Sequence, residues 1–109
     1  MIFVTPEDTV GAALERMSES GVTQIPVLEE YRSVGSLRES RVLTKLLNNR
    51  ELIESKVRDV MDESFPVIEM DTSLREIKSK LQKAPAVLIE DFKRITGIIT
   101  RSDVLDLQK

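Results

Sequence analysis

The sequence predicts an α+β fold built from two copies of one small β-α-β-β-α unit. The same order of strand-like and helix-like segments occurs twice along the 109 residues. Aligning Gly35 with Gly97 places VGSLRESRVL over TGIITRSDVL, so the ends of the two copies also correspond. One copy of about 45 residues buries little apolar surface, so we expect both copies to pack as one body with pseudo-twofold symmetry. The predicted organisation is repeat 1 at 1–47, a connecting segment at 48–64 and repeat 2 at 65–109.

Repeat 1 opens with a strand-like segment at 2–4, followed by an apolar pattern of helical spacing. The members of this pattern are Val10, Ala13, Leu14 and Met17. QIPVL at 24–28 and SVGSL at 33–37 predict two strands separated by a charged turn. The unit ends with a second helical pattern formed by Val42, Leu43, Leu46 and Leu47.

Repeat 2 follows the same order from FPVI at 65–68 onward. Its first helix is expected to begin at Ser73, because Ser73 and Glu76 match a capping box, in which both side chains accept free backbone N–H groups. The apolar face of that helix consists of Leu74, Ile77 and Leu81. PAVLI at 85–89 and ITGIIT at 95–100 predict the paired strands.

The connecting segment 48–64 contains no Gly or Pro, so a flexible tether is not expected. Its apolar residues recur at roughly helical spacing and predict a short linker followed by a helix that packs on repeat 2. They are Leu52, Ile53, Val57, Val60 and Met61. Three methionines in or near apolar stripes, Met17, Met61 and Met70, are expected to fill the core.

The composition excludes most catalytic designs. The chain has no Cys and no His, which removes disulfides, thiolate metal sites and the commonest general base. Adjacent acids at 29–30, 62–63 and 90–91 are expected to face solvent rather than to perform acid–base catalysis. We therefore expect no enzymatic activity, no cofactor and no metal site.

The charge and hydropathy of the chain predict a soluble cytoplasmic protein. The net charge is −3 with acids and bases well mixed, whereas nucleic-acid binders usually carry a basic face. The apolar runs are far shorter than the roughly 20 residues of a membrane span. The first residues, MIFVTPEDT, lack the basic and apolar regions of a secretion signal. Neither nucleic acid nor a membrane is an expected partner.

The segment GIITRSD, 97–103, places a hydroxyl and a carboxylate directly after an apolar strand. If Thr100 caps the following helix, Asp103 lies about one turn away on the same side. A carboxylate can accept hydrogen bonds from both vicinal hydroxyls of a ribose, and such charge-assisted bonds are strong. The alternative is that the pair only caps the helix, since Thr-x-x-Asp is also a common helix start. The two roles are compatible.

The order of elements and four segments together resemble a tandem pair of CBS domains, the Bateman module. The segments are QIPVL at 24–28, VGSLRESRVL at 34–43, KVRDVM at 56–61 and TGIITRSDVL at 96–105. The resemblance covers essentially the whole chain. It is greatest to the regulatory region that follows the pyridoxal-phosphate fold of cystathionine β-synthase-like enzymes. This implies that the chain is a fragment of a larger enzyme or a detached module.

The resemblance further implies one adenosine-ligand site per chain, built from both repeats. The residues carried over are Thr100, Ser102, Asp103 and Ile98 for the ribose and its surroundings, and Val22, Gln24, Ile25 and Pro26 for an apolar slot around the base. The ligand would be S-adenosylmethionine, AMP or ATP. The expected partners are this ligand, a second copy of the chain in a homodimer, and a fused or associated pyridoxal-phosphate enzyme.

Repeat 1 departs from this pattern, because Arg38 and Arg41 stand where repeat 2 has Thr100 and Asp103. A guanidinium cannot accept a hydrogen bond, so the ribose clasp is absent there. The two arginines either contact a phosphate or carboxylate of a ligand or lie on a solvated helix face, with Ser36 and Glu39 forming an alternative cap. We favour the solvated face, since Arg is mostly exposed.

Three classes of function remain. The leading hypothesis is a regulatory sensor in which the adenosine ligand changes the packing or the dimer contacts of the repeats. The second is a ligand-free dimerisation or protein-interaction module in which Thr100 and Asp103 only cap a helix. The third, an enzyme, is disfavoured by the absence of His and Cys.

Overall fold

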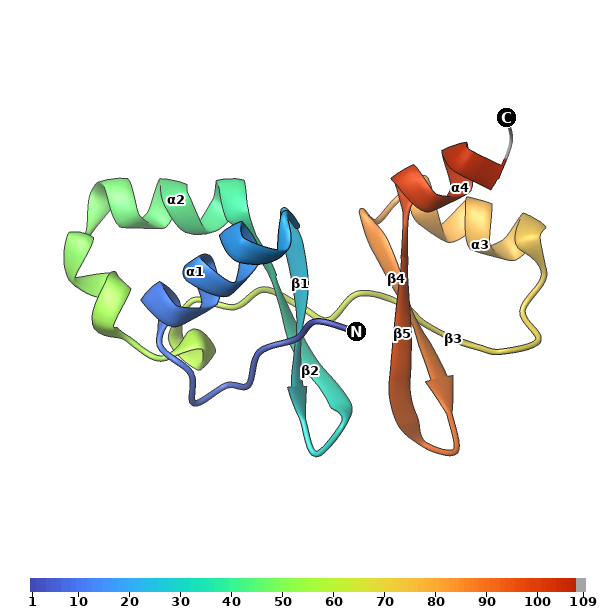
Figure 1. Cartoon of the computed structure of the whole chain (residues 1–109), viewed down its shortest axis with the longest axis horizontal. Helices are drawn as coiled ribbons and strands as arrows, with labels where there is room; N and C mark the ends of the chain where they lie inside the picture. Colours follow the sequence, from blue (N-terminus) through green and yellow to red (C-terminus); the bar gives the residue numbers. More distant parts are fainter. Residues whose placement is uncertain (108–109) are drawn as a thin grey trace. The chain divides into compact units, whose positions relative to one another are not determined.

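The chain folds into two compact units (Figure 1). The structure is a computed structural model and describes residues 1–107. One unit contains Ile2–Glu29 and Ser33–Ser64; the other contains the described residues from Phe65 to 107, together with Met1 and Glu30–Arg32. Gln108 and Lys109, at the end of predicted repeat 2, lie outside the described residues. The mixture of helices and strands confirms the predicted α+β class.

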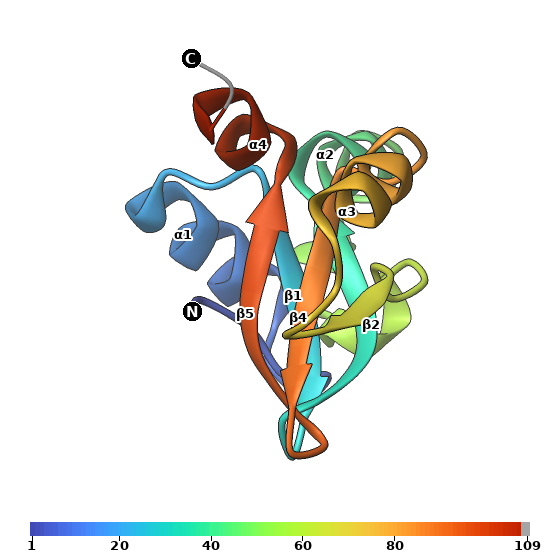
Figure 2. The same cartoon turned by 90° about the vertical axis from the view of Figure 1, so that its right-hand side faces the viewer.

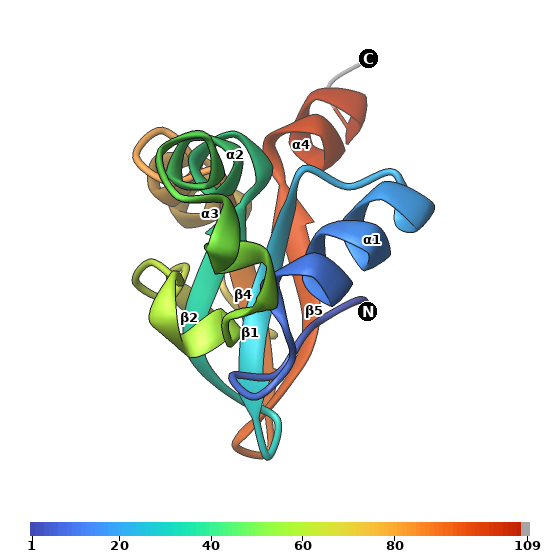
Figure 3. The ribbon, with the colours of Figure 1, turned by 90° about the vertical axis from the view of Figure 1, so that its left-hand side faces the viewer.

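The first unit has two helices on one face of a two-stranded sheet (Figure 3). Its elements are α1 (Val10–Ser20), β1 (Gln24–Glu29), β2 (Arg32–Arg38) and α2 (Glu39–Asn48). The strand predicted at 2–4 is reduced to one residue, Val4, which forms a parallel bridge with Val27. Backbone bonds from Val4 N–H to the Pro26 carbonyl and from Leu28 N–H to the Val4 carbonyl hold that bridge.

Local sequence explains where α1 begins and ends. Thr9 caps its start, because the Thr9 hydroxyl accepts a hydrogen bond from the Ala12 N–H at 3.1 Å. Gly21 ends it with φ of 68°, a left-handed conformation that glycine adopts without steric cost. The Val22 N–H then donates to the Met17 carbonyl at 3.0 Å, which completes a Schellman motif.

The core of the first unit includes residues from the connecting segment. Its buried members are Val4, Val10, Ala13, Met17, Ile25, Val27, Leu37, Val42, Val57 and Val60. The segment forms two short 3-10 helices, η1 (Arg50–Glu54) and η2 (Val57–Asp59), instead of one α-helix. The Val57 N–H donates to the Asp8 carbonyl at 2.8 Å, and the Val10 N–H donates to the Ser55 carbonyl at 2.9 Å. The prediction that this segment forms a helix packed on repeat 2 was therefore wrong.

The connecting segment also extends the sheet of the first unit. Ser36 and Asp62 form an antiparallel bridge through two backbone hydrogen bonds of 3.0 and 2.9 Å. Met61 crosses Gly35 so closely that a Cβ added to Gly35 would lie 2.6 Å from the Met61 sulfur. Glycine fits here because the Met61 side chain and the Asp62 carbonyl oxygen, 3.0 Å from the same Cβ position, both approach β2.

The second unit has a three-stranded sheet with two helices on one face (Figure 2). β3 (Val67–Glu69) runs parallel to β4 (Ala86–Asp91), which pairs antiparallel with β5 (Arg94–Thr100). The helices are α3 (Leu74–Leu81) and α4 (Arg101–Leu107). The core cluster on their side of the sheet contains Ile68, Leu81, Val87 and Val104, with Ile77, Ile89 and Ile99 packed against it.

Two sequence predictions for the second unit have different outcomes. Ser73 caps α3 as predicted, with its hydroxyl accepting from the Glu76 N–H at 3.2 Å. Met70 was expected to fill the core, but 68% of its surface is exposed, because it follows β3 in a turn. Of the other two methionines, Met17 is fully buried and Met61 is partly buried against the first core.

Each hairpin turns through two residues in the left-handed region. The φ angles are 51° and 64° at Glu30 and Tyr31, and 50° and 64° at Phe92 and Lys93. Positive φ at both central residues is the geometry of a type I′ turn, which matches the twist of the flanking strands. Such turns usually contain Asn or Gly, so four larger residues here are unusual.

Candidate functional site: the junction of β5 and α4

Thr100 and Asp103 contact each other where β5 ends and α4 begins. One oxygen of the Asp103 carboxylate, Oδ2, accepts hydrogen bonds from the Thr100 N–H at 2.8 Å and from the Thr100 hydroxyl at 3.1 Å. Asp103 is exposed and Thr100 is half-buried. The predicted spacing of one helical turn between hydroxyl and carboxylate is therefore present.

This contact performs the capping role and leaves hydrogen-bonding capacity for a ligand. The carboxylate accepts the Thr100 N–H, one of the free donors at the start of a helix. Oδ1 of Asp103 and the lone pairs of the Thr100 hydroxyl have no hydrogen-bond donor among the described residues. Both groups can accept a hydrogen bond from a vicinal diol. Because Asp103 is already exposed, the carboxylate loses little hydration until a ligand covers it.

The residues next to Thr100 and Asp103 lie at the end of β5 and in the first turn of α4. Ile99 packs against the core of the second unit, so alternation along β5 places Ile98 and Thr100 on the opposite face of the sheet. Ser102 is exposed in the first turn of α4. The Arg101 Nε donates to the Leu81 carbonyl at 2.7 Å, which ties the first turn of α4 to the end of α3. Ile98, Thr100, Ser102 and Asp103 therefore lie within one short stretch of the second unit.

The four residues predicted to surround the base lie in the first unit. Val22 is partly buried against the core as part of the Schellman motif, and Gln24 is half-buried at the start of β1. The Ile25 side chain is fully buried in the core, so any contact of Ile25 with a ligand would involve its backbone. Pro26 is also buried, but it alternates with Ile25 and faces the other side of β1. That these residues share one ligand with Thr100 and Asp103 stays a prediction.

The corresponding junction in the first unit forms an ion-pair network. The Arg41 Nε lies 3.3 Å from one oxygen of Asp62, and the Lys45 Nζ lies 3.7 Å from the other. The predicted cap by Ser36 and Glu39 was wrong, because the Ser36 hydroxyl donates to the Glu63 carbonyl at 2.6 Å and α2 has no side-chain cap. The Asp62 side chain is only 23% exposed, so its predicted solvent position was wrong too.

Three interactions at the two strand–helix junctions were not predicted from the sequence. Asp62 neutralises Arg41, and only the folding of the connecting segment onto β2 brings the two together. The Thr23 carbonyl accepts the Glu39 N–H at 2.9 Å and so supports the start of α2. Arg101 lies within GIITRSD, but its contact with Leu81 depends on the end of α3, which no local pattern predicts.

The described residues contain neither a metal-binding cluster nor a membrane-spanning helix. No group of three or more acidic side chains between residues 1 and 107 is placed to hold a metal ion. Within the same range, every helix is too short or too polar to cross a bilayer.

The fold and the site define the class of the protein as a duplicated β-α-β-β-α unit with a hydroxyl–carboxylate contact after its final strand. The sequence matches the family described as CBS domain twice, over residues 1–48 and 57–109. The chain belongs to the CBS-domain family, as a tandem pair. The predicted resemblance to a Bateman module is confirmed at this level.

Similar proteins include both free-standing and larger chains. The chain is 28% identical over 104 residues to a zinc metalloprotease of Methanocaldococcus jannaschii, which covers 95% of this chain and 28% of the protease. A CBS-domain protein of unknown function from Bacillus anthracis matches with a TM-score of 0.87 at 25% identity, covering 98% of this chain and 83% of that one. A protein of M. jannaschii, described as a candidate archaeal homologue of g-AMPK, matches with a TM-score of 0.86 at 24% identity, covering 100% and 44%.

Proposed function

We propose that this CBS pair senses an adenosine-containing ligand, either S-adenosylmethionine, AMP or ATP, and binds its ribose at Thr100 and Asp103. The observation that carries the proposal is the hydroxyl–carboxylate contact at the β5–α4 junction. The Asp103 carboxylate and the Thr100 hydroxyl offer acceptors to two vicinal hydroxyls at an exposed position. The three candidate ligands are those that the resemblance to a CBS pair implies, and the family match supports that resemblance.

The proposal assigns one ribose clasp per chain. In the first unit, Arg41 occupies the place of Asp103 and is already paired with Asp62. That guanidinium would have to leave its partner before it could contact a phosphate. Ser102 and Ile98 are proposed to line the second-unit site, while Val22, Gln24, Ile25 and Pro26 are proposed to surround the base. Ligand binding is the function in this proposal, and no reaction is catalysed.

Regulation would follow from differential affinity. A ligand changes an equilibrium between two arrangements only by as much as it prefers one of them. The chain spans 28% of the length of the metalloprotease that it resembles, so CBS pairs of this kind also occur within much longer proteins. We propose that the output is the activity of a fused or associated protein in the cytoplasm, with a pyridoxal-phosphate enzyme as one candidate.

A second candidate function is a self-associating module without a ligand. Leu43 and Leu47 lie one turn apart on α2 and are 46% and 85% exposed, which gives this helix an uncovered apolar stripe. Such a stripe favours contact with another helix. A homodimer is compatible with ligand sensing, so only a titration separates the two functions.

We expect at least one of the three adenosine ligands to stabilise the wild-type protein in a thermal-shift and calorimetric titration. A ligand present at about 100 times its dissociation constant adds about 2.7 kcal/mol to the free energy of unfolding. In the variant Asp103→Ala this gain is expected to disappear, because the carboxylate that accepts the ribose hydroxyls is gone.

Loss of the Asp103 carboxylate also removes a helix cap, so a capping control is required. Ser73→Ala removes the cap of α3 and should cost about 1 kcal/mol of stability without changing ligand affinity. If none of the three ligands stabilises the wild type, the self-associating module replaces the sensor. The same conclusion follows if Ser73→Ala weakens binding as much as Asp103→Ala does.

A further inference from the structure

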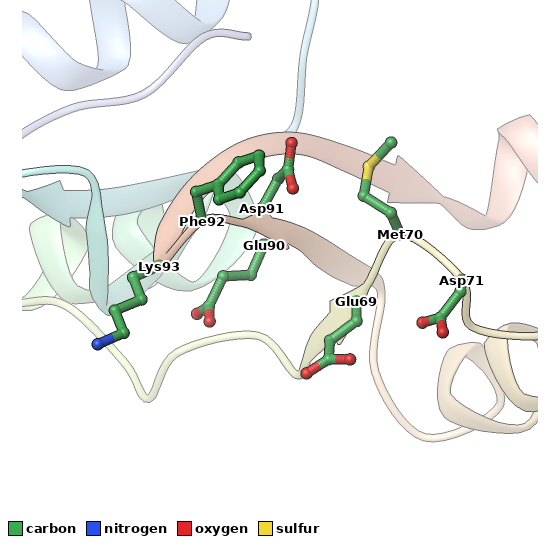
Figure 4. A pocket seen from close by; sticks show the side chains of 7 residues that line it. All are labelled: Glu69, Met70, Asp71, Glu90, Asp91, Phe92 and Lys93. Atoms are coloured by element: carbon green, nitrogen blue, oxygen red, sulfur yellow. The ribbon is translucent and has the colours of Figure 1, made fainter.

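The tip of the β4–β5 hairpin and the end of β3 surround an open hollow of about 530 Å³ with unusual chemistry (Figure 4). The residues lining it are Glu69, Met70, Asp71, Glu90, Asp91, Phe92 and Lys93. Four carboxylates and one ammonium group give this lining a net charge of −3, which equals the net charge of the whole chain. The other charged side chains of the sequence sum to zero, so this lining is acidic in a chain whose remaining charges are equal in number.

The apolar residues of the hollow are exposed, and Phe92 also has a strained backbone. Phe92 is 93% exposed and Met70 is 68% exposed. Phe92 also has φ of 50°, a left-handed conformation that costs a bulky side chain roughly 1–2 kcal/mol. An aromatic residue that is both strained and solvated gains nothing from contacts within its own chain.

Two of the four carboxylates of the hollow, those of Glu69 and Glu90, lie on neighbouring strands and repel each other. Glu69 and Glu90 are direct partners in the register of β3 and β4, and like charges at such a pair are destabilising. Figure 4 shows both side chains extending to the same side. None of the four carboxylates forms an ion pair with any residue between 1 and 107. A cationic partner would relieve this repulsion.

We propose that this hollow, formed by the seven residues above, binds a basic peptide segment of a partner protein that carries an apolar side chain. Charge complementarity determines the partner, because arginine or lysine side chains would pair with the four carboxylates. An apolar side chain of the peptide would cover Phe92 and Met70, and a buried aromatic is the usual centre of such an interface. Nucleic acids and anionic membranes carry the opposite charge from the one required.

The test uses a fluorescent synthetic peptide in which pairs of arginines flank two leucines, with binding followed by anisotropy. We expect wild-type protein to bind it, and Phe92→Asn to weaken binding at least about tenfold, the effect of losing a central contact. Asn tolerates positive φ better than Phe, so this variant should keep or raise its melting temperature. Weaker binding by an equally stable protein would then report a lost contact.

Lys93→Gly is the matched control in the same turn. Gly accepts the φ of 64° without strain, and the change removes the ammonium that repels a basic peptide. This variant should therefore bind as tightly as the wild type or more tightly. Glu90→Gln combined with Asp91→Asn should weaken binding at about 0.05 M salt, and the difference should shrink at about 0.5 M salt. Glu15→Gln combined with Glu19→Gln, on α1, should leave binding unchanged.

Several results would overturn the proposal. The wild type could fail to bind the arginine–leucine peptide, or Phe92→Asn could bind it as well as the wild type does. A peptide with serines in place of the leucines could bind equally well, or the α1 charge variant could lose as much affinity as the hairpin variant. If sedimentation shows instead that Phe92→Asn dissociates a dimer, the hollow is covered by a second copy of the chain.

Discussion

Replacing Gly35 with alanine is expected to lower the free energy of unfolding by about 1–3 kcal/mol, the usual cost of overpacking. The new methyl group would lie 2.6 Å from the Met61 sulfur and 3.0 Å from the Asp62 carbonyl oxygen. The methionine side chain can move, but the carbonyl belongs to the bridge between Asp62 and Ser36. Urea denaturation followed by circular dichroism measures the change.

Gly97 is the matched control, because it occupies the same place in the second repeat. A methyl group there would lie 3.5 Å from the nearest atom of Ile89, an ordinary van der Waals contact. Gly97→Ala is therefore expected to be neutral or stabilising by up to about 1 kcal/mol, through the entropy of the unfolded chain. If both substitutions lower the free energy of unfolding equally, the close contact of Met61 and Asp62 with Gly35 is not the cause of the destabilisation.

Truncating Ile25 to alanine is expected to cost about 2–5 kcal/mol, as for other large core residues. Its side chain is fully buried among the core residues of the first unit. The adjacent Gln24 is half-buried at the start of β1, so Gln24→Ala should change stability by less than about 1 kcal/mol. Denaturation curves of the two variants, recorded without ligand, give this comparison.

The two substitutions also separate folding from the proposed recognition of the base. Gln24→Ala should weaken binding of the adenosine ligand while the protein remains folded. Ile25→Ala should reduce stability with or without ligand, and its effect on affinity should be small in the fraction that remains folded. If Ile25→Ala leaves stability unchanged, the assignment of Ile25 to the core is wrong.

The sequence predicted the elements of each repeat well, because their signals are local. Helical spacing located α1 and α2, and Ser73 marked the start of α3. The alignment of Gly35 with Gly97 predicted equivalent hairpins, and both turns have the same pair of positive φ angles. Periodicity and capping act over a few residues, so they can be read without knowing the fold.

The connecting segment was misread because its structure depends on distant residues. Val57 and Val60 have helical spacing, but their burial against the first core and the backbone bond from Val57 to Asp8 select short 3-10 helices instead. Met70 was misread for the opposite reason, since an apolar residue beside a strand does not have to be buried. In the connecting segment the local structure depends on tertiary contacts, and at Met70 the exposure reflects the lack of them.

At the candidate site too, contacts between residues close in the sequence were predicted and contacts between distant segments were not. The contact between Thr100 and Asp103 was predicted from their spacing, because one helical turn brings positions of this kind together. The pairing of Arg41 with Asp62 was not predicted, because the two residues come from α2 and from the connecting segment. Ile25 was assigned to the site by resemblance, and this stays a prediction for its backbone; its side chain lies in the core, as strand alternation explains.

The central claim is that Asp103 holds the hydroxyls of a ribose. It is tested most directly by removing the ribose hydroxyls and the Asp103 carboxylate, first separately and then together. Calorimetry would compare ATP with its 2′,3′-dideoxy analogue, or the equivalent pair for whichever adenosine ligand binds, on wild type and Asp103→Asn. We expect loss of the hydroxyls to weaken wild-type binding by at least about tenfold, or about 1.4 kcal/mol, and to have little further effect in the variant. Equal losses from the dideoxy ligand in both proteins would contradict the claim.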